Sequence, residues 1–122
     1  MALTVLKNTP IHAVVAVSGT SATETINLSS TIATASQTAS SPVVHIKAIH
    51  WSVPSGNATI TRNSVQLWAM TGAYTHDFHG FSDNRENTSN IVVVTPAGGG
   101  TVILELVKIS GYGDTQHVNP LT

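Results

Sequence analysis

Residues 90–109 read NIVVVTPAGGGTVILELVKI, which is two β-branched and aliphatic runs separated by a glycine-rich connection. The runs cover residues 91–95 and 101–109, and three consecutive glycines lie at positions 98–100. Glycine adopts a positive φ at low steric cost, and β-branched side chains suit a pleated surface. The stretch therefore predicts a β-hairpin, and with it a fold built from strands.

Short apolar segments of the same kind recur along the rest of the chain. Strands are expected over residues 3–7, 11–17, 23–28, 43–53, 58–62, 65–70 and 75–81. Asn63-Ser64 has the spacing of a tight turn between two of them, and Pro54-Ser55-Gly56 is expected to end the strand over 43–53. Residues 29–41 are expected to form a surface loop or a weak edge strand, and residues 82–90 a polar turn.

About eight short strands with turn residues between them, and no helical period, are typical of an all-β protein. The pattern predicts a single antiparallel β-sandwich, with jelly-roll and immunoglobulin-like strand orders both open. The predicted domain covers residues 1–113 and includes an N-terminal arm over residues 1–8. Residues 114–122 are expected to form an extended C-terminal tail.

The composition bounds the function. The 122 residues contain no cysteine, which excludes disulfides and thiolate metal sites. Only 9% of the residues are charged, against about a quarter in an ordinary globular protein. A surface of hydroxyls and few charges suits lateral packing against other protein, although a plain threonine-rich β domain would have the same composition.

The distribution of charge and apolar residues argues against two classes of partner. The five basic residues are scattered and the formal net charge is −1, so nucleic-acid binding is not expected. No apolar run approaches the ~18 residues of a membrane span, and the N-terminus does not resemble a signal peptide. The expectation is a protein made in the cytoplasm, with no membrane partner.

Two polar clusters contain metal-ligand residue types. His76 and His79 flank Asp77, but positions i and i+3 of a strand project to opposite faces, so exposed histidines are the expectation. Asp83, Asn84, Glu86 and Asn87 lack the ordered alternation and the bidentate acid of a calcium loop. No metal site is therefore predicted.

Motifs for covalent catalysis or cofactor binding are missing from the sequence. It contains no Gly-x-Ser-x-Gly motif and no cysteine nucleophile, and glycines 98–100 precede a strand where a phosphate loop would precede a helix. The prediction is a protein that is not an enzyme, with no catalytic residue and no cofactor. Trp51, Trp68, Tyr74 and Tyr112 could form a sugar-stacking platform, but core packing is the first interpretation for both tryptophans.

Three stretches carry a family resemblance: ITRNSVQLW at 60–68, NRENTSNIVVV at 84–94 and GTVILELVKISGY at 100–112. They resemble small virion structural proteins of marine tailed phages, with the likeness spanning residues 43–112. The chain departs from the usual pattern at Asn63-Ser64, where Asn-Gly would be expected. The resemblance implies that the protein is part of a phage particle, made in the host cytoplasm.

Within the particle, the expected role is a capsid decoration, or cement, protein on the outer surface of the major capsid shell. The expected partners are the major capsid protein or other virion proteins, together with further copies of the chain as a homo-oligomer. The terminal segments are the expected contact arms, with these contact residues: Leu3, Val5, Leu6, His117, Val118, Pro120 and Leu121. The alternatives are a tail, neck or fibre component, and a carbohydrate-binding module for host attachment.

Overall fold

The computed structural model describes residues 3–35, 37–78 and 88–114, and these residues form an antiparallel all-β structure. The all-β class predicted from the sequence is confirmed. Seven strands lie within the described residues: β1 (Leu3–Asn8), β2 (His12–Gly19), β3 (Thr23–Ile26), β4 (Gln37–Arg62), β5 (Val65–Asp77), β6 (Ile91–Val94) and β7 (Gly100–Asp114).

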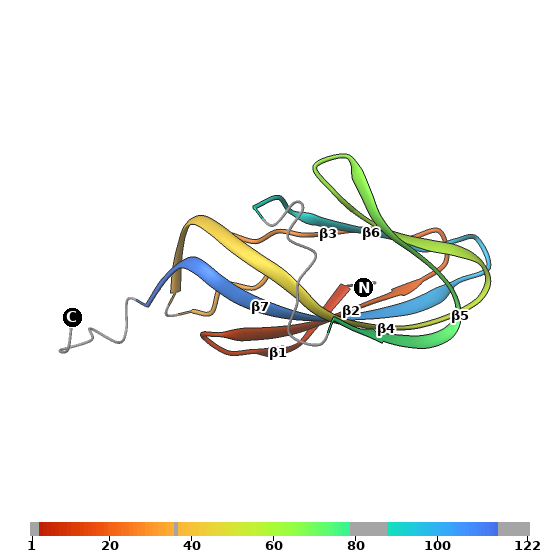
Figure 1. Ribbon diagram of the computed structural model, residues 1–122, viewed down its shortest axis with the longest axis horizontal. Helices are drawn as coiled ribbons and strands as arrows, with labels where there is room; N and C mark the ends of the chain where they lie inside the picture. Colours follow the sequence, from red (N-terminus) through yellow and green to blue (C-terminus); the bar gives the residue numbers. More distant parts are fainter. Residues whose placement is uncertain (1–2, 36, 79–87, 115–122) are drawn as a thin grey trace.

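The strands form one hydrogen-bonded sheet that curls over the core. Its order is β1-β2-β7-β4-β6-β3, and β5 pairs with β4 off this path. The 26-residue strand β4 pairs with β7 up to Ser52 and with β6 from Thr59 onward, so it lies in both layers. Figure 1 shows β3 and β6 lying across from β2 and β7, with β4 and β5 joining the two layers. The sequence predicted a sandwich, and the structure instead joins the two layers into a single continuous sheet.

The prediction of a hairpin over residues 91–109 is wrong, because the two strands do not pair with each other. β6 pairs with β3 and β4, whereas β7 lies between β2 and β4. Both strands alternate buried and partly buried residues, so each presents an apolar face to the core from opposite layers. The connection therefore crosses between the layers, and a glycine-rich loop serves this crossing as well as it serves a hairpin.

The loop between β6 and β7, which crosses between the layers, is hydrogen-bonded to the turn between β2 and β3. The amide of Thr95 donates to the carbonyl of Ala22 at 2.8 Å, and the Thr95 hydroxyl accepts from the Ala22 amide at 2.9 Å. The carbonyl of Pro96 accepts from the amides of Ser21 and Gly99, both at 2.9 Å. Gly99 has a φ of +86°, which a residue with a side chain rarely adopts.

Strand β4 bends where the sequence predicted that it would end. Its pairing with β5 is interrupted between Val53 and Ala58, but the strand continues to Arg62. Gly56 has a φ of +74°, and a Cβ atom there would lie 2.9 Å from the Pro96 Cβ. Gly72, which pairs with Val53 on β5, has a φ of +76°. Glycines on both strands thus let the β4–β5 pair bend as a unit from one layer to the other.

Other strand predictions are confirmed or corrected in detail. The tight turn at Asn63-Ser64 is confirmed, with φ values of +50° and +61° that match a primed hairpin turn. The strand predicted over residues 75–81 is not separate, because β5 runs without a break to Asp77. The strand predicted over residues 3–7 is confirmed, and within the predicted arm over residues 1–8 the described residues 3–8 form β1 and pair with β2.

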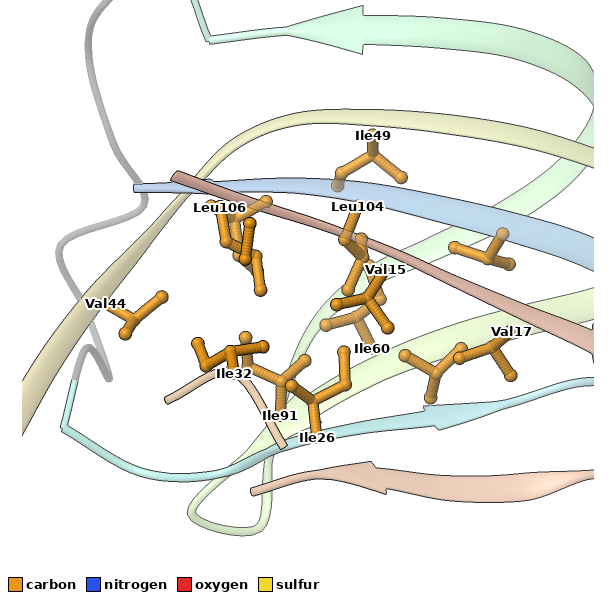
Figure 2. Packing of buried hydrophobic residues seen from close by; sticks show 14 of the residues in the cluster. Val15, Val17, Ile26, Ile32, Val44, Ile49, Ile60, Ile91, Leu104 and Leu106 are labelled. Atoms are coloured by element: carbon orange, nitrogen blue, oxygen red, sulfur yellow. The ribbon is translucent and has the colours of Figure 1, made fainter. Parts of the chain in front are cut away.

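The core lies between the two layers. Figure 2 shows Ile26, Ile32 and Ile91 pointing toward Leu104 and Leu106 from the opposite side. Ile32 is fully buried, although the surrounding Ser- and Thr-rich segment was expected to contribute little to the core. The segment over residues 29–41 has two parts. From residue 37 it belongs to β4 and pairs with the end of β7, and before residue 37 a turn places Ile32 in the core.

Lys108 is buried, and its ammonium group connects three strands through hydrogen bonds. Its Nζ atom donates to Asn8 Oδ1 at 2.7 Å, to the Thr9 carbonyl at 2.8 Å and to Gln37 Oε1 at 2.8 Å. The ammonium also lies 5.1 Å from the centre of the Tyr112 ring. These contacts tie the turn after β1 and the start of β4 to β7.

At the other end of β4, Arg62 also connects separate segments through hydrogen bonds. Its side chain is fully buried. Nε and Nη2 donate to the Ser89 carbonyl at 3.0 and 2.8 Å, and Nη1 donates to the Val44 carbonyl at 2.9 Å. The guanidinium therefore connects the end of β4 to Val44 in its first half and to the segment before β6.

Replacing Arg62 with methionine should destabilise the protein by about 2–4 kcal/mol, because the Ser89 and Val44 carbonyls lose buried donors. Lys47→Met at an exposed position should change the free energy of unfolding by less than about 0.5 kcal/mol. Urea denaturation of both variants measures this difference. Equal stability of the two variants would show that the Arg62 contacts contribute nothing to the fold.

The buried Lys108 and the half-buried Tyr112 at the end of β7 predict an alkaline dependence of stability. Burial lowers the pKa of Lys108 from 10.5 to about 8 and raises the pKa of Tyr112 from 10.0 to about 12. Between pH 8 and 10 the unfolded chain binds more protons at Lys108 than the folded chain, so stability should rise with pH. Above pH 10 the unfolded chain loses the Tyr112 proton first, which lowers stability.

The measurement is the free energy of unfolding of the wild type minus that of Lys108→Met, from pH 7 to pH 10. This difference should increase through the upper half of the range. A difference that stays constant or decreases would contradict the lowered pKa of Lys108.

Candidate functional site

The outer face of the sheet carries a row of polar side chains across β5, β4 and β7. On β7, Val102 and Leu104 are buried, so the alternating Ile103 and Glu105 point away from the core. On β4, His50 lies between the buried Ile49 and the half-buried Trp51 and points outward. The register places His50 opposite Thr75 on one side and Ile103 on the other.

Three of these side chains form a hydrogen-bonded chain. His50 Nδ1 lies 3.0 Å from Thr75 Oγ1, and His50 Nε2 lies 2.5 Å from Glu105 Oε2. A Glu105 carboxylate accepts from Nε2–H, which leaves Nδ1 to accept from the Thr75 hydroxyl. This is the order of groups, hydroxyl to imidazole to carboxylate, that activates a nucleophile in many hydrolases.

These three hydrogen-bonded side chains lie on an open surface. A hollow of about 520 Å³ includes His50, Thr75, Ser52 and Thr101 in its lining. The His50 and Glu105 side chains are 37% and 36% exposed, so water reaches both partners. Acyl transfer also needs preorganised donors for the oxyanion and a site that excludes water. The arrangement orients a hydroxyl and an imidazole, and what it offers a partner is hydrogen bonds.

We expect the hydrogen-bonded group of Thr75, His50 and Glu105 to have no esterase activity. The purified protein should hydrolyse p-nitrophenyl acetate no faster than free histidine at six times its concentration, because the chain has six histidines and exposed imidazole alone attacks this ester. Thr75→Ala should leave the rate unchanged. A fall of about tenfold or more in Thr75→Ala, which corresponds to 1.4 kcal/mol of barrier, would instead identify Thr75 as a nucleophile.

The four aromatic residues singled out in the sequence do not form one platform. Trp51 and Trp68 are half-buried against the core, which confirms the first interpretation for both. Trp51 Nε1 donates to the Thr71 carbonyl at 3.0 Å, and the Tyr112 hydroxyl donates to the Leu28 carbonyl at 2.5 Å. Tyr74, at 67% exposure, lies with its ring centre 6.2 Å from that of Trp51.

The histidine cluster is split by the structure. His76 lies on β5, and its ring centre is 4.5 Å from those of both Trp68 and Phe78. His79 lies outside the described residues, as do positions 83, 84, 86 and 87 of the second polar cluster. Among the residues that are described, no three His, Asp or Glu side chains come together as a metal site would require.

The predicted contact residues of the N-terminal segment lie on the first edge of the sheet. Within the described part of the chain, strand β1 pairs with β2 alone, so no described strand covers its other side. Val5 and Leu6 are 36% and 55% exposed, while Leu3 packs against the core. The other predicted contact residues, His117, Val118, Pro120 and Leu121, lie outside the described residues.

Two further exposed apolar residues lie where the β2–β7 pairing ends, and they were missed in the sequence. Ile11 and Ile109 are 59% and 51% exposed, and they are close in space because the Lys108 amide donates to the Ile11 carbonyl at 2.7 Å. Ile11 was expected to belong to the strand over residues 11–17, but β2 begins only at His12. The apolar edge is defined here as Val5 and Leu6 of β1.

Comparisons with known proteins give little guidance. No protein-family model matches the chain, and no curated protein matches it. Among solved structures, the chain is similar to a cupin domain from Bordetella pertussis, with 10% identity and a TM-score of 0.43 over 88% of this chain and 92% of that chain. These values are too low to assign the chain to that fold family. Within the described residues, no helix is long and apolar enough to cross a membrane.

Proposed function

We propose that this chain is a virion structural protein of a phage that decorates the outer surface of the capsid shell. The observation that carries the proposal is the apolar edge. Among the described residues, it combines a strand that pairs on one side with two exposed aliphatic side chains, and these features favour contact with protein. The resemblance of residues 43–112 to small phage virion proteins supplies the setting.

The chemistry of the edge supports docking by strand or side-chain contacts. An unpaired strand edge offers amide and carbonyl groups to a neighbouring chain, and soluble proteins usually blunt such edges with charges, prolines or bulges. Strand β1 has one lysine and a register shift between Val5 and Lys7, but Val5 and Leu6 remain exposed around that shift. Capsid protein, or a second copy of this chain in a homo-oligomer, is the proposed partner.

The rest of the surface fits the same role. Only 11 of the 122 residues are Lys, Arg, Asp or Glu, so repulsion between neighbouring copies is weak. The proposal includes no enzymatic activity and no cofactor, and the open setting of His50 and Thr75 supports this. Of the two strand orders, the jelly-roll-related one is proposed, because β4 pairs in both layers whereas each immunoglobulin strand belongs to one sheet.

Copy number distinguishes the shell from the alternative location in a tail, neck or fibre. Quantitative mass spectrometry of purified particles should give hundreds of copies of the chain per particle, because a decoration protein follows the symmetry of the shell. Six, twelve or a few dozen copies would assign it to the tail, and its absence from particles would contradict the proposal.

Point variants test the apolar edge without removing β1 from the sheet. Val5→Lys/Leu6→Lys should lower retention on particles by about tenfold or more, since burying two ammonium groups opposes apolar contact. Thr25→Lys/Ala69→Lys adds the same charge at exposed positions on β3 and β5 and should be retained like the wild type. Equal retention of both double variants would show that docking uses another surface.

The third candidate, a carbohydrate-binding module, requires ring faces open to a sugar. Tyr74 is the one member of the aromatic set that is mostly exposed within the described residues. A glycan array is therefore expected to give no hit with the wild-type chain. A hit abolished by Tyr74→Ala would favour the sugar-binding alternative over capsid decoration.

A further inference from the structure

Two of the five basic residues come together on the outer face of the sheet. Arg62 and Lys108 are buried, and Arg85 lies outside the described residues. The remaining two, Lys7 and Lys47, both line a hollow of about 170 Å³, together with His12 and Glu105. The exposed lysines in the described part of the chain are thus gathered at one place on a weakly charged protein.

The strand register explains how residues 40 positions apart meet. Lys7 pairs with Val14, Val14 pairs with Glu105, and Glu105 pairs with Ala48, which follows Lys47. These residues form a row across β1, β2, β7 and β4. Neighbouring strands lie about 4.8 Å apart, so the row is about 14 Å wide, and two lysine side chains can reach toward its centre from both ends.

The positive charge of this row is only partly neutralised. Glu105, near its centre, already accepts from His50 Nε2 at 2.5 Å. Lys7 and Lys47 form no ion pair with any described residue. In the lining of the hollow, two lysines face one carboxylate, that of Glu105. Asp77 is not part of the lining and lies on β5 opposite Ala48.

We infer that the hollow between Lys7 and Lys47 binds carboxylate side chains from an acidic segment of a partner protein. The inference rests on the proposed function, because it states the chemistry of the surface on which the chain docks. Two lysines on a chain of net charge −1 are too few to follow a nucleic-acid backbone. They match one or two carboxylates, and the hydroxyls of the surrounding face can complete the hydrogen bonding.

The test uses the full-length protein and a fluorescein-labelled peptide of ten glutamates, with binding measured by fluorescence anisotropy. Lys7→Gln/Lys47→Gln should weaken binding by about tenfold or more, and raising the salt from about 50 to 300 mM should weaken wild-type binding. Thr25→Glu/Gln66→Glu lowers the net charge by the same two units at exposed positions on β3 and β5. It should weaken binding by less than about threefold.

Three outcomes would overturn the inference: no binding of the peptide, an equal loss in both double variants, or tighter binding of a ten-nucleotide DNA strand than of the peptide. Thermal unfolding of each variant shows that it is folded. The same experiments distinguish this inference from the proposed function. If the protein binds the peptide but does not associate with particles, capsid decoration is refuted and the lysine site is retained.

Discussion

The structure depends on one constraint, which is that β4 belongs to both layers. Its first part pairs with β7 and its last part with β6, and the bend between them is made where Gly56 and Gly72 adopt positive φ. Because one strand connects the layers through hydrogen bonds, they cannot slide apart as two separate sheets could. Arg62, the last residue of β4, reinforces this connection by donating to the Val44 carbonyl in the first half of β4 and to the Ser89 carbonyl before β6.

The curl determines which surfaces remain for function. One face of the sheet packs against the core, so a partner that contacts the described strands approaches their outer face or the free edge of β1. Strand β1 ends the sheet order next to β2, and its apolar side chains remain in solvent there. The outer face presents short polar side chains with Lys7 and Lys47 in one row. The proposed shell contacts and the proposed carboxylate contacts therefore lie on adjoining parts of one surface.

Local features of this fold could be predicted from the sequence, and long-range pairing could not. Alternating apolar residues predicted most strands, and Asn63-Ser64 predicted its turn, because both signals arise from neighbouring residues. The hairpin over 91–109 failed because glycines 98–100 satisfy a crossing loop and a hairpin equally well. The contacts of Lys108 join positions 71 to 100 residues apart, so no local pattern indicates them. The exposed Leu6 and Ile11 likewise depend on where the sheet ends.

The most direct test of the shared-strand architecture is a set of backbone proton contacts from nuclear magnetic resonance of the isotopically labelled protein. The account predicts cross-strand contacts of Val102 with both Val17 and Trp51, and of Val93 with Ile60. A ladder of contacts between residues 91–95 and 101–105 would mean that β6 and β7 form a hairpin. That result would contradict the curled sheet and every surface derived from it.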